Sequence, residues 1–134
     1  MTSMKSRVPA VSQARRVRGV AACAAGRMGE DSVRRDYLAR GYALVASRWR
    51  GQAGEIDLIL RQGDEFVFVE VKSSARHDQA AQRLSRRQMD RICHAALEFC
   101  GQLATGLMTL MRFDAALVDR VGRVEIIENA FGMD

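Results

Sequence analysis

One stretch of the sequence, Gly54–Lys72 (GEIDLILRQGDEFVFVEVK), constrains the fold more than any other. It predicts two short strands, Glu55–Leu60 and Glu65–Lys72, joined by a tight turn around Gly63. Successive side chains of a strand point to opposite faces, and both faces of both strands are mostly apolar. This pattern is typical of strands that other elements cover on both sides. The stretch therefore predicts a hairpin in the middle of a layered domain.

Charged side chains interrupt these apolar strands. Glu70 and Lys72 are predicted to share one face of the second strand with its two phenylalanines. One face of the first strand is predicted to hold Glu55, Asp57 and Ile59, and the other face Ile56, Leu58 and Leu60. Charges in apolar surroundings cost free energy unless something compensates them. A divalent cation would compensate the carboxylates of Asp57 and Glu70, which indicates metal-assisted hydrolysis.

The rest of the chain predicts a mixed α/β domain with a helix on each side of a central sheet. A flexible tail is expected at residues 1–12, and a single domain at residues 13–134. Helices are predicted at residues 13–40 and Gln82–Cys100, a loop at Ser73–Gln79, and further strands at Tyr42–Arg50, Met111–Val118 and Val124–Ile127.

The net charge of the chain indicates which class of partner such a domain binds. The 134 residues carry a formal net charge of +5, which suits a polyanion such as nucleic acid. Arginines recur at helical spacing near the second predicted helix and are candidate contacts to phosphates: Arg83, Arg86, Arg87 and Arg91. A solvated basic face is the alternative interpretation.

The cellular compartment follows from cysteines and hydropathy. The three cysteines form no CxxC pair, which indicates reduced thiols in a cytoplasmic protein. No apolar run approaches the length of a membrane-spanning helix, and no secretory signal is expected. We therefore expect a cytoplasmic protein without a membrane partner.

Four short segments, taken in order, resemble the YraN-like family of uncharacterised bacterial proteins. They are GRMGED at 26–31, GEIDLI at 54–59, FVEVK at 68–72 and RFD at 112–114. Asp57 followed by Glu70-Val71-Lys72 also resembles the D…(D/E)xK core of the restriction-endonuclease-like nucleases. The YraN-like family is similar in fold to archaeal Holliday-junction resolvases. The resemblance therefore implies a restriction-endonuclease-like α/β fold, with a central mixed β-sheet flanked by helices on both sides.

The resemblance also implies roles for individual residues. Asp57 and Glu70 match the strand carboxylates that bind Mg²⁺ or Mn²⁺, Lys72 matches the active-site lysine, and Glu30 matches the acidic residue that completes the metal site. Gln88 matches, more loosely, a helix residue that lies near the site in related nucleases and joins the candidate nucleic-acid contacts. Glu55 shares a predicted face with Asp57 and is interpreted as a supporting residue. The implied activity is a metal-dependent DNA endonuclease, with branched or otherwise non-standard DNA as substrate and a homodimer as the acting form.

A non-catalytic protein is the alternative: a nuclease fold that binds nucleic acid or another protein. The intact acid–acid–lysine set favours the enzyme, because a binding module does not need it. A nucleotide-cofactor enzyme is disfavoured, since the sequence contains neither GxGxxG nor GxxxxGK[ST].

Overall fold

The structure is a computed structural model that describes residues 29–132. The predicted tail at residues 1–12 and the first part of the predicted helix at 13–40 lie outside these residues.

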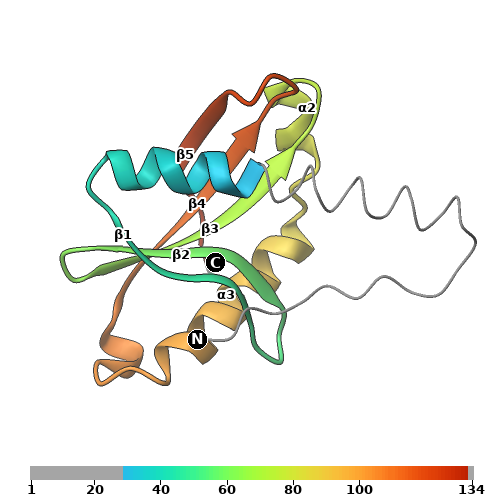
Figure 1. The fold of residues 1–134 in the computed structure, drawn as a ribbon. Helices are drawn as coiled ribbons and strands as arrows, with labels where there is room; N and C mark the ends of the chain where they lie inside the picture. The colour runs from blue at the N-terminus through green and yellow to red at the C-terminus, as the bar shows by residue number, and fades with distance from the viewer. Residues whose placement is uncertain (1–28, 133–134) are drawn as a thin grey trace, which may run out of the picture.

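A five-stranded mixed sheet forms the middle layer (Figure 1). Its strands lie side by side in chain order: β1 (Ala43–Arg50), β2 (Glu55–Gln62), β3 (Glu65–Ser73), β4 (Leu110–Val118) and β5 (Val124–Phe131). Only β3 and β4 are parallel; the other neighbouring strands are antiparallel. A parallel pair needs a crossover, and here it consists of α2 (His77–Gln82), α3 (Arg86–Cys100) and the 3-10 helix η1 (Gly106–Met108).

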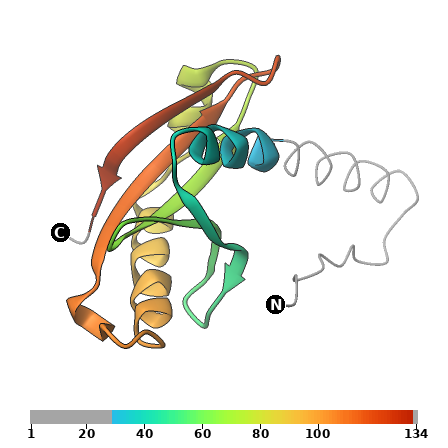
Figure 2. The same cartoon turned by 60° about the vertical axis from the view of Figure 1, so that its left-hand side comes forward.

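Helices cover both faces of this sheet (Figures 1 and 2). On one face lies the first helix, which covers residues 29–39 in the described part of the chain and is followed by Gly41 at a φ of 94°. Its Val33 and Tyr37 pack against aliphatic side chains of β2 and β3. On the other face, Ile92 and Phe99 of α3 pack against Phe68 and other aromatic side chains of the sheet. The predicted α/β architecture is confirmed, and it encloses the hairpin Gly54–Lys72 from both sides.

The segment after β3 differs from the prediction. Ser73–Gln79 was expected to be a loop, but α2 begins within it at His77. The helix expected at Gln82–Cys100 begins later, at Arg86, because the hydroxyl of Ser85 accepts a hydrogen bond from the N–H of Gln88 at 3.1 Å and caps the helix there. The last strand also extends beyond its predicted end, to Phe131.

The alternation of side chains along β2 breaks at one place. Leu58 and Leu60 face the first helix, but Ile56 packs on the α3 side with Ile59, which contradicts the predicted grouping. The break lies where β2 stops pairing with β3, at the Leu58–Val69 pair. It also lies beside Arg48 of β1, whose φ of 53° departs from extended backbone. At this place β2 therefore has an irregular neighbour, β1, on one side and no partner on the other. Such local irregularity disrupts the strict two-residue alternation of a strand.

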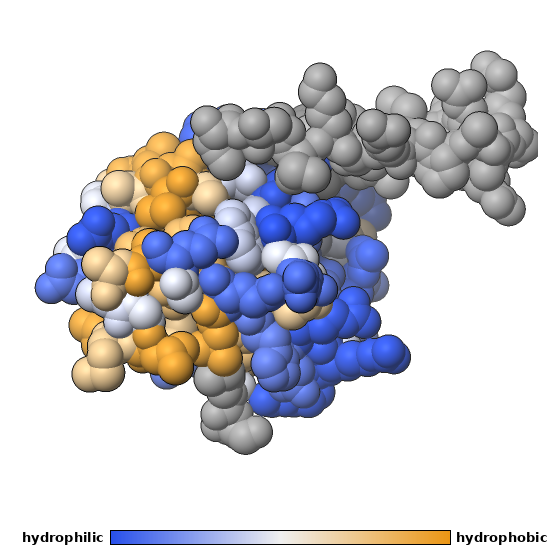
Figure 3. All heavy atoms as spheres, turned by 90° about the horizontal axis from the view of Figure 1, so that it is seen from below, coloured by the Kyte–Doolittle hydropathy of each residue, from blue (hydrophilic) through white to orange (hydrophobic). Residues whose placement is uncertain are grey.

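Exposed hydrophobic side chains gather at one end of the molecule, which Figure 3 shows beside a hydrophilic surface. Leu107, Met108 and Leu110 are 75%, 85% and 60% exposed. Leu110 pairs with Glu65, at the opposite end of β3 from Lys72. This surface therefore lies apart from the predicted site. No helix within residues 29–132 is long and apolar enough to cross a membrane.

Candidate metal-dependent nuclease site

The two predicted strand carboxylates meet where β2 and β3 separate. The strands pair as far as Leu58 and Val69, and beyond that point the N–H of Val71 donates to Oδ2 of Asp57 at 2.8 Å. The carboxyl group of Glu70 lies close enough to that of Asp57 to raise its pKa. Glu70 is only 4% exposed. The break in the ladder thus leaves the two carboxyl groups close to each other at one place.

The electrostatics of this pair are unfavourable at neutral pH. Burial raises the pKa of Asp57 well above its ordinary value, and the negative charge of Glu70 raises it further. The hydrogen bond from Val71 opposes this shift, because it stabilises the ionised form. Within residues 29–132, Asp57 forms no ion pair with a lysine or arginine. Of the two carboxylates, Asp57 is therefore the one without a direct ion pair in the described part of the chain.

Glu70, in contrast, is held from two directions. Nζ of Lys72 lies 2.9 Å from Oε2 of Glu70, and the side-chain amide of Gln88 on α3 donates to the same oxygen. The alternation predicted for β3 is confirmed here, since Glu70 and Lys72 lie on one face of the strand. Gln88, predicted as a nucleic-acid contact, lies in the carboxylate site through this bond.

Glu30 reaches the same region from the first helix. The pKa of Glu30 is raised above its ordinary value. Burial is the main cause and the charges of Asp57 and Glu55 add to it, whereas the hydrogen bond with Arg48 opposes the shift. Oε1 of Glu30 lies 2.9 Å from Nε of Arg48. The predicted supporting residue Glu55 lies nearby, with its carboxylate 3.9 Å from the guanidinium of Arg50. Glu30 and Glu55 thus lie near enough to Asp57 for their charges to affect its surroundings, while each is paired with an arginine of β1.

Arg48 is a charged residue of the candidate site that no sequence pattern indicated. Its guanidinium is hydrogen-bonded to Glu30, and the more distant negative charges of Glu55 and Asp57 also raise its pKa. Together with Glu30 it lines a cavity of about 150 Å³, bordered also by Asp31, Arg34, Ser47 and Leu58. No pattern in the sequence distinguishes it from Arg50, because only the positive φ of Arg48 departs from a regular strand.

The donor set fits a hard divalent cation in part. Mg²⁺ and Mn²⁺ prefer oxygen ligands, and one or two carboxylates suffice because Mg²⁺ keeps several waters. Asp57 and Glu70 supply two such carboxylates side by side. Among residues 29–132, no three His, Cys, Asp or Glu side chains converge as a ready-made metal site. Glu30, the expected third ligand, is engaged with Arg48.

The predicted basic residues are all exposed, but they differ in their contacts. Arg83 donates to the carbonyl oxygen of Ser73 at 2.8 Å, and Arg86 pairs with Asp90 at 2.9 Å. Arg87 and Arg91 lie one turn apart on α3. A Cβ placed on Gly54 would lie 3.8 Å from Arg91, so this arginine borders the start of the hairpin. Arg91 is therefore the predicted arginine that lies beside the start of the hairpin, and Arg87 lies one turn before it.

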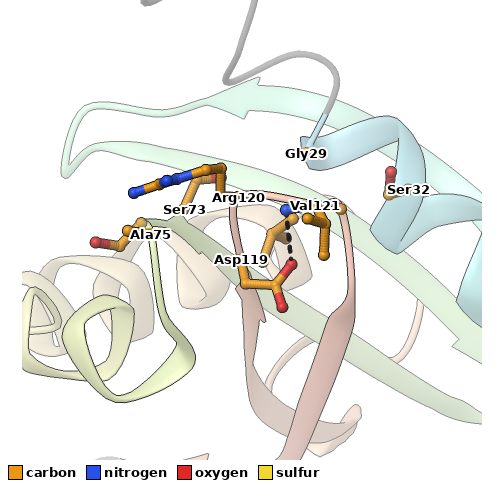
Figure 4. A pocket seen from close by; sticks show the side chains of 10 residues that line it. Gly29, Ser32, Ser73, Ala75, Asp119, Arg120 and Val121 are labelled. Atoms are coloured by element: carbon orange, nitrogen blue, oxygen red, sulfur yellow. Dashed lines mark hydrogen bonds between the residues drawn. The ribbon is translucent and has the colours of Figure 1, made fainter.

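A larger cavity, of about 480 Å³, opens directly after Lys72 (Figure 4). It is lined by Gly29, Ser32, the segment 73–75, Val118 and the segment 119–122. Gly29 permits a close approach here, because a Cβ at this position would lie 2.8 Å from Oγ of Ser73. The first helix can consequently pack against the end of β3.

Known proteins match most of the chain. The profile described as "Uncharacterised protein family UPF0102" matches residues 29–118, which include all the predicted acidic residues and Lys72. A UPF0102 protein of Ruegeria pomeroyi is 59% identical over 108 residues, 81% of this chain and 88% of its own. One of Cereibacter sphaeroides is 58% identical over 107 residues, 80% of this chain and 92% of its own. One of Ruegeria sp. is 49% identical over 122 residues, 91% of this chain and 98% of its own.

Proposed function

The chain belongs to the uncharacterised protein family UPF0102, the YraN-like family that its motifs resemble, and from this premise we propose that it is a divalent-metal-dependent nuclease acting on DNA. By the same resemblance the proposal extends to branched or otherwise non-standard DNA as substrate, to a homodimer and to the cytoplasm.

The observation that carries the proposal is the convergence of Asp57, Glu70 and Lys72 where β2 and β3 separate, with Asp57 held by the N–H of Val71 at 2.8 Å and Glu70 2.9 Å from Lys72. Two carboxyl groups held together in a largely buried place repel one another when both are ionised. A purely structural ion pair would provide Asp57 with a cation, whereas the lysine of this site contacts Glu70. A carboxyl group with a strongly raised pKa, such as that of Asp57, is typical of catalytic sites when a lysine lies nearby. A divalent cation would relieve the repulsion and make the arrangement useful.

Each residue has a chemical role in this proposal. Mg²⁺ or Mn²⁺ bound by Asp57 and Glu70 would supply Lewis-acid stabilisation and a water of lowered pKa. The N–H of Val71 fixes the carboxylate of Asp57, and Gln88 fixes that of Glu70. Lys72 adds positive charge where the phosphate gains negative charge in the transition state. Glu30 serves as an accessory ligand or as the base that positions the attacking water.

A cleavage assay tests the proposed function. The full chain is incubated with four-way junction, flap, single-stranded and duplex DNA, with Mg²⁺, Mn²⁺ or EDTA. We expect metal-dependent cutting of at least one substrate, and a loss of about 10²–10³-fold in rate for Lys72→Ala, the range seen when one transition-state contact is removed. Equal behaviour of the wild type, Lys72→Ala and Asp57→Asn on every substrate contradicts the proposal. Binding without cutting, weakened by salt, supports the non-catalytic alternative.

Removing two arginines of α3 is expected to weaken DNA binding without affecting metal binding. Each phosphate contact contributes about one unit to the slope of log affinity against log salt, so Arg87→Ala/Arg91→Ala should reduce that slope by about two. The measurement is a salt titration of binding in EDTA. Arg61→Ala is the matched control, because Arg61 is exposed at the distant hairpin turn, where its contacts are local: to the carbonyl of Gly63, to Asp64 and to the ring of Phe66. An equal loss for Arg61→Ala would show a diffuse charge effect rather than an interface.

A further inference from the structure

Arg48 occupies an unusual place for an arginine on a strand. Its backbone has a φ of 53°, a region that arginine rarely adopts. Its Nε lies 2.9 Å from Oε1 of Glu30, and its side chain is only 22% exposed. The neighbouring Arg50 is 62% exposed and lies no closer than 3.9 Å to Glu55. The positive φ at Arg48 of β1 therefore coincides with a largely buried positive charge beside the acidic residues.

The charges of the site are divided unevenly between its cations. Lys72 contacts Glu70 and Arg48 contacts Glu30, both at 2.9 Å. Asp57 lies near Glu30, Glu55 and Glu70, and no ion pair to it forms among residues 29–132. A divalent cation at Asp57 would attract the carboxylate of Glu30 and repel the guanidinium of Arg48. In the structure Glu30 is paired with Arg48, and no three acidic side chains converge as a metal site in the described part of the chain.

We propose that Arg48 holds Glu30 out of the metal site, so that Glu30 becomes a ligand of the divalent cation only when the Glu30–Arg48 ion pair opens. The inference rests on the proposed function and deepens it. Arg48 is a positioning residue in this scheme: it acts through Glu30 and sets whether the cation has two or three carboxylate ligands. The cavity of about 150 Å³ beside the pair gives the two side chains room to separate.

Binding of Mn²⁺ alone, measured by calorimetry or by the electron paramagnetic resonance of free Mn²⁺, tests the proposal without DNA. Arg48→Asn removes the charge and suits the positive φ, since asparagine enters this region more readily. We expect it to bind Mn²⁺ about tenfold more tightly, because it removes a like charge and releases a carboxylate. Arg48→Lys keeps the charge and should bind as the wild type does. Arg50→Asn is the matched control on the same strand and should also leave the affinity unchanged.

A double-mutant cycle makes the test specific. Glu30→Gln should change the Mn²⁺ affinity little in the wild type, where Glu30 is paired with Arg48. The same substitution should weaken Mn²⁺ binding about tenfold in the Arg48→Asn background, where Glu30 has become a ligand. Unchanged or weaker binding by Arg48→Asn overturns the inference, as does an equal cost of Glu30→Gln in both backgrounds.

The proposed function fails by a different result. If Asp57→Asn binds Mn²⁺ as well as the wild type does, the carboxylate pair is not the metal site. Binding that depends on Asp57 but is indifferent to Arg48 leaves the nuclease proposal standing and removes only the role of Arg48. Circular dichroism of each variant confirms that it is folded before its affinity is compared.

Discussion

Asp57→Asn is expected to raise the stability of the metal-free protein while abolishing its metal binding and its cleavage activity. The amide oxygen of asparagine can still accept the hydrogen bond from Val71, which is 2.8 Å long in the wild type. The substitution removes only the buried charge that faces Glu70. We expect the melting temperature in EDTA at about pH 8 to rise by a few degrees. We expect the cleavage rate to fall by at least about a hundredfold, since even outer-shell residues of metal sites cost about 10–100-fold.

The raised pKa of Asp57 also predicts how the stability of the folded protein changes with pH. The pKa of Asp57 is raised above 3.8 in the folded protein, so the folded state holds its proton at pH values where the unfolded chain has lost it. Stability therefore falls as the pH rises from about 4 through the raised pKa of Asp57, and stays low above it. Urea unfolding in EDTA across this range should show the fall in the wild type and a smaller fall in Asp57→Asn. A variant less stable than the wild type at about pH 8 would contradict the repulsion between the two carboxylates.

Metal addition separates the two proteins further. At a Mn²⁺ concentration of about 100 times the dissociation constant, binding stabilises the wild type by about 2.7 kcal/mol, and it should not stabilise Asp57→Asn. Asp64→Asn is the matched control. Its carboxylate is 94% exposed at the hairpin turn, so neither the stability nor the response to Mn²⁺ should change.

Asp114→Ala is expected to be the most destabilising single substitution in the fold. Asp114 is fully buried on β4 and accepts four hydrogen bonds: from Tyr37 at 2.7 Å, from Nε and Nη2 of Arg112 at 2.9 Å each, and from the N–H of Asn129 at 2.9 Å. Its loss leaves Arg112 without its main counter-charge, in a place where the arginine side chain is only 15% exposed. Breaking a buried ion pair by removing one partner costs about 3–5 kcal/mol.

Denaturant unfolding measures this cost. Tyr37→Phe, which removes one donor to Asp114, should cost less, about 1–3 kcal/mol. Asp90→Ala removes the partner of Arg86 in an exposed ion pair of 2.9 Å and should change stability by less than about 1 kcal/mol. A loss at Asp114 no larger than that at Asp90 would show that the network is dispensable.

The hydrogen bond between Tyr37 and Asp114 helps to explain how Glu30, on the first helix, comes to lie at the site. Glu30, Val33 and Tyr37 follow one another at spacings of three and four residues, which places them on one face of the first helix. Val33 and Tyr37 are buried against the sheet, and Tyr37 is tied to Asp114. Burial raises the pKa of Tyr37, and the bond to Asp114 raises it further, so its hydroxyl remains a donor. The helix is thus anchored two turns from Glu30.

The sequence predicted the regular part of the hairpin because β3 is paired on both sides along most of its length. Its two-residue alternation is therefore strict, and Glu70 and Lys72 lie on the expected face. The prediction for Ile56 was wrong because β2 loses its partner at Leu58, a tertiary event that leaves no mark in the composition of the strand.

The backbone conformation of Arg48 and the partners of Asp114 could not be predicted from the sequence. A positive φ costs a non-glycine residue about 1–3 kcal/mol, and arginine carries no signal for it. The segment RFD at 112–114 was recognisable as a motif, but its partner Tyr37 lies 77 residues away along the chain. Pairings at such separations depend on the whole topology rather than on a local pattern. The six-residue helix α2 was not predicted because it is short and no side chain caps its N-terminus.

The distances along the chain have a consequence for the order in which the site can form. Val71 meets Asp57 across 14 residues, Gln88 meets Glu70 across 18, and Glu30 meets Arg48 across 18. These closures are short, whereas the Tyr37–Asp114 closure that anchors the first helix spans 77 residues. Loop entropy makes longer closures costlier, and non-local contacts slow folding. The hairpin can therefore hold Asp57, Glu70 and Lys72 together before β4 locks Glu30 in place, and a nascent chain lacks the complete site until residues beyond Asp114 have been added.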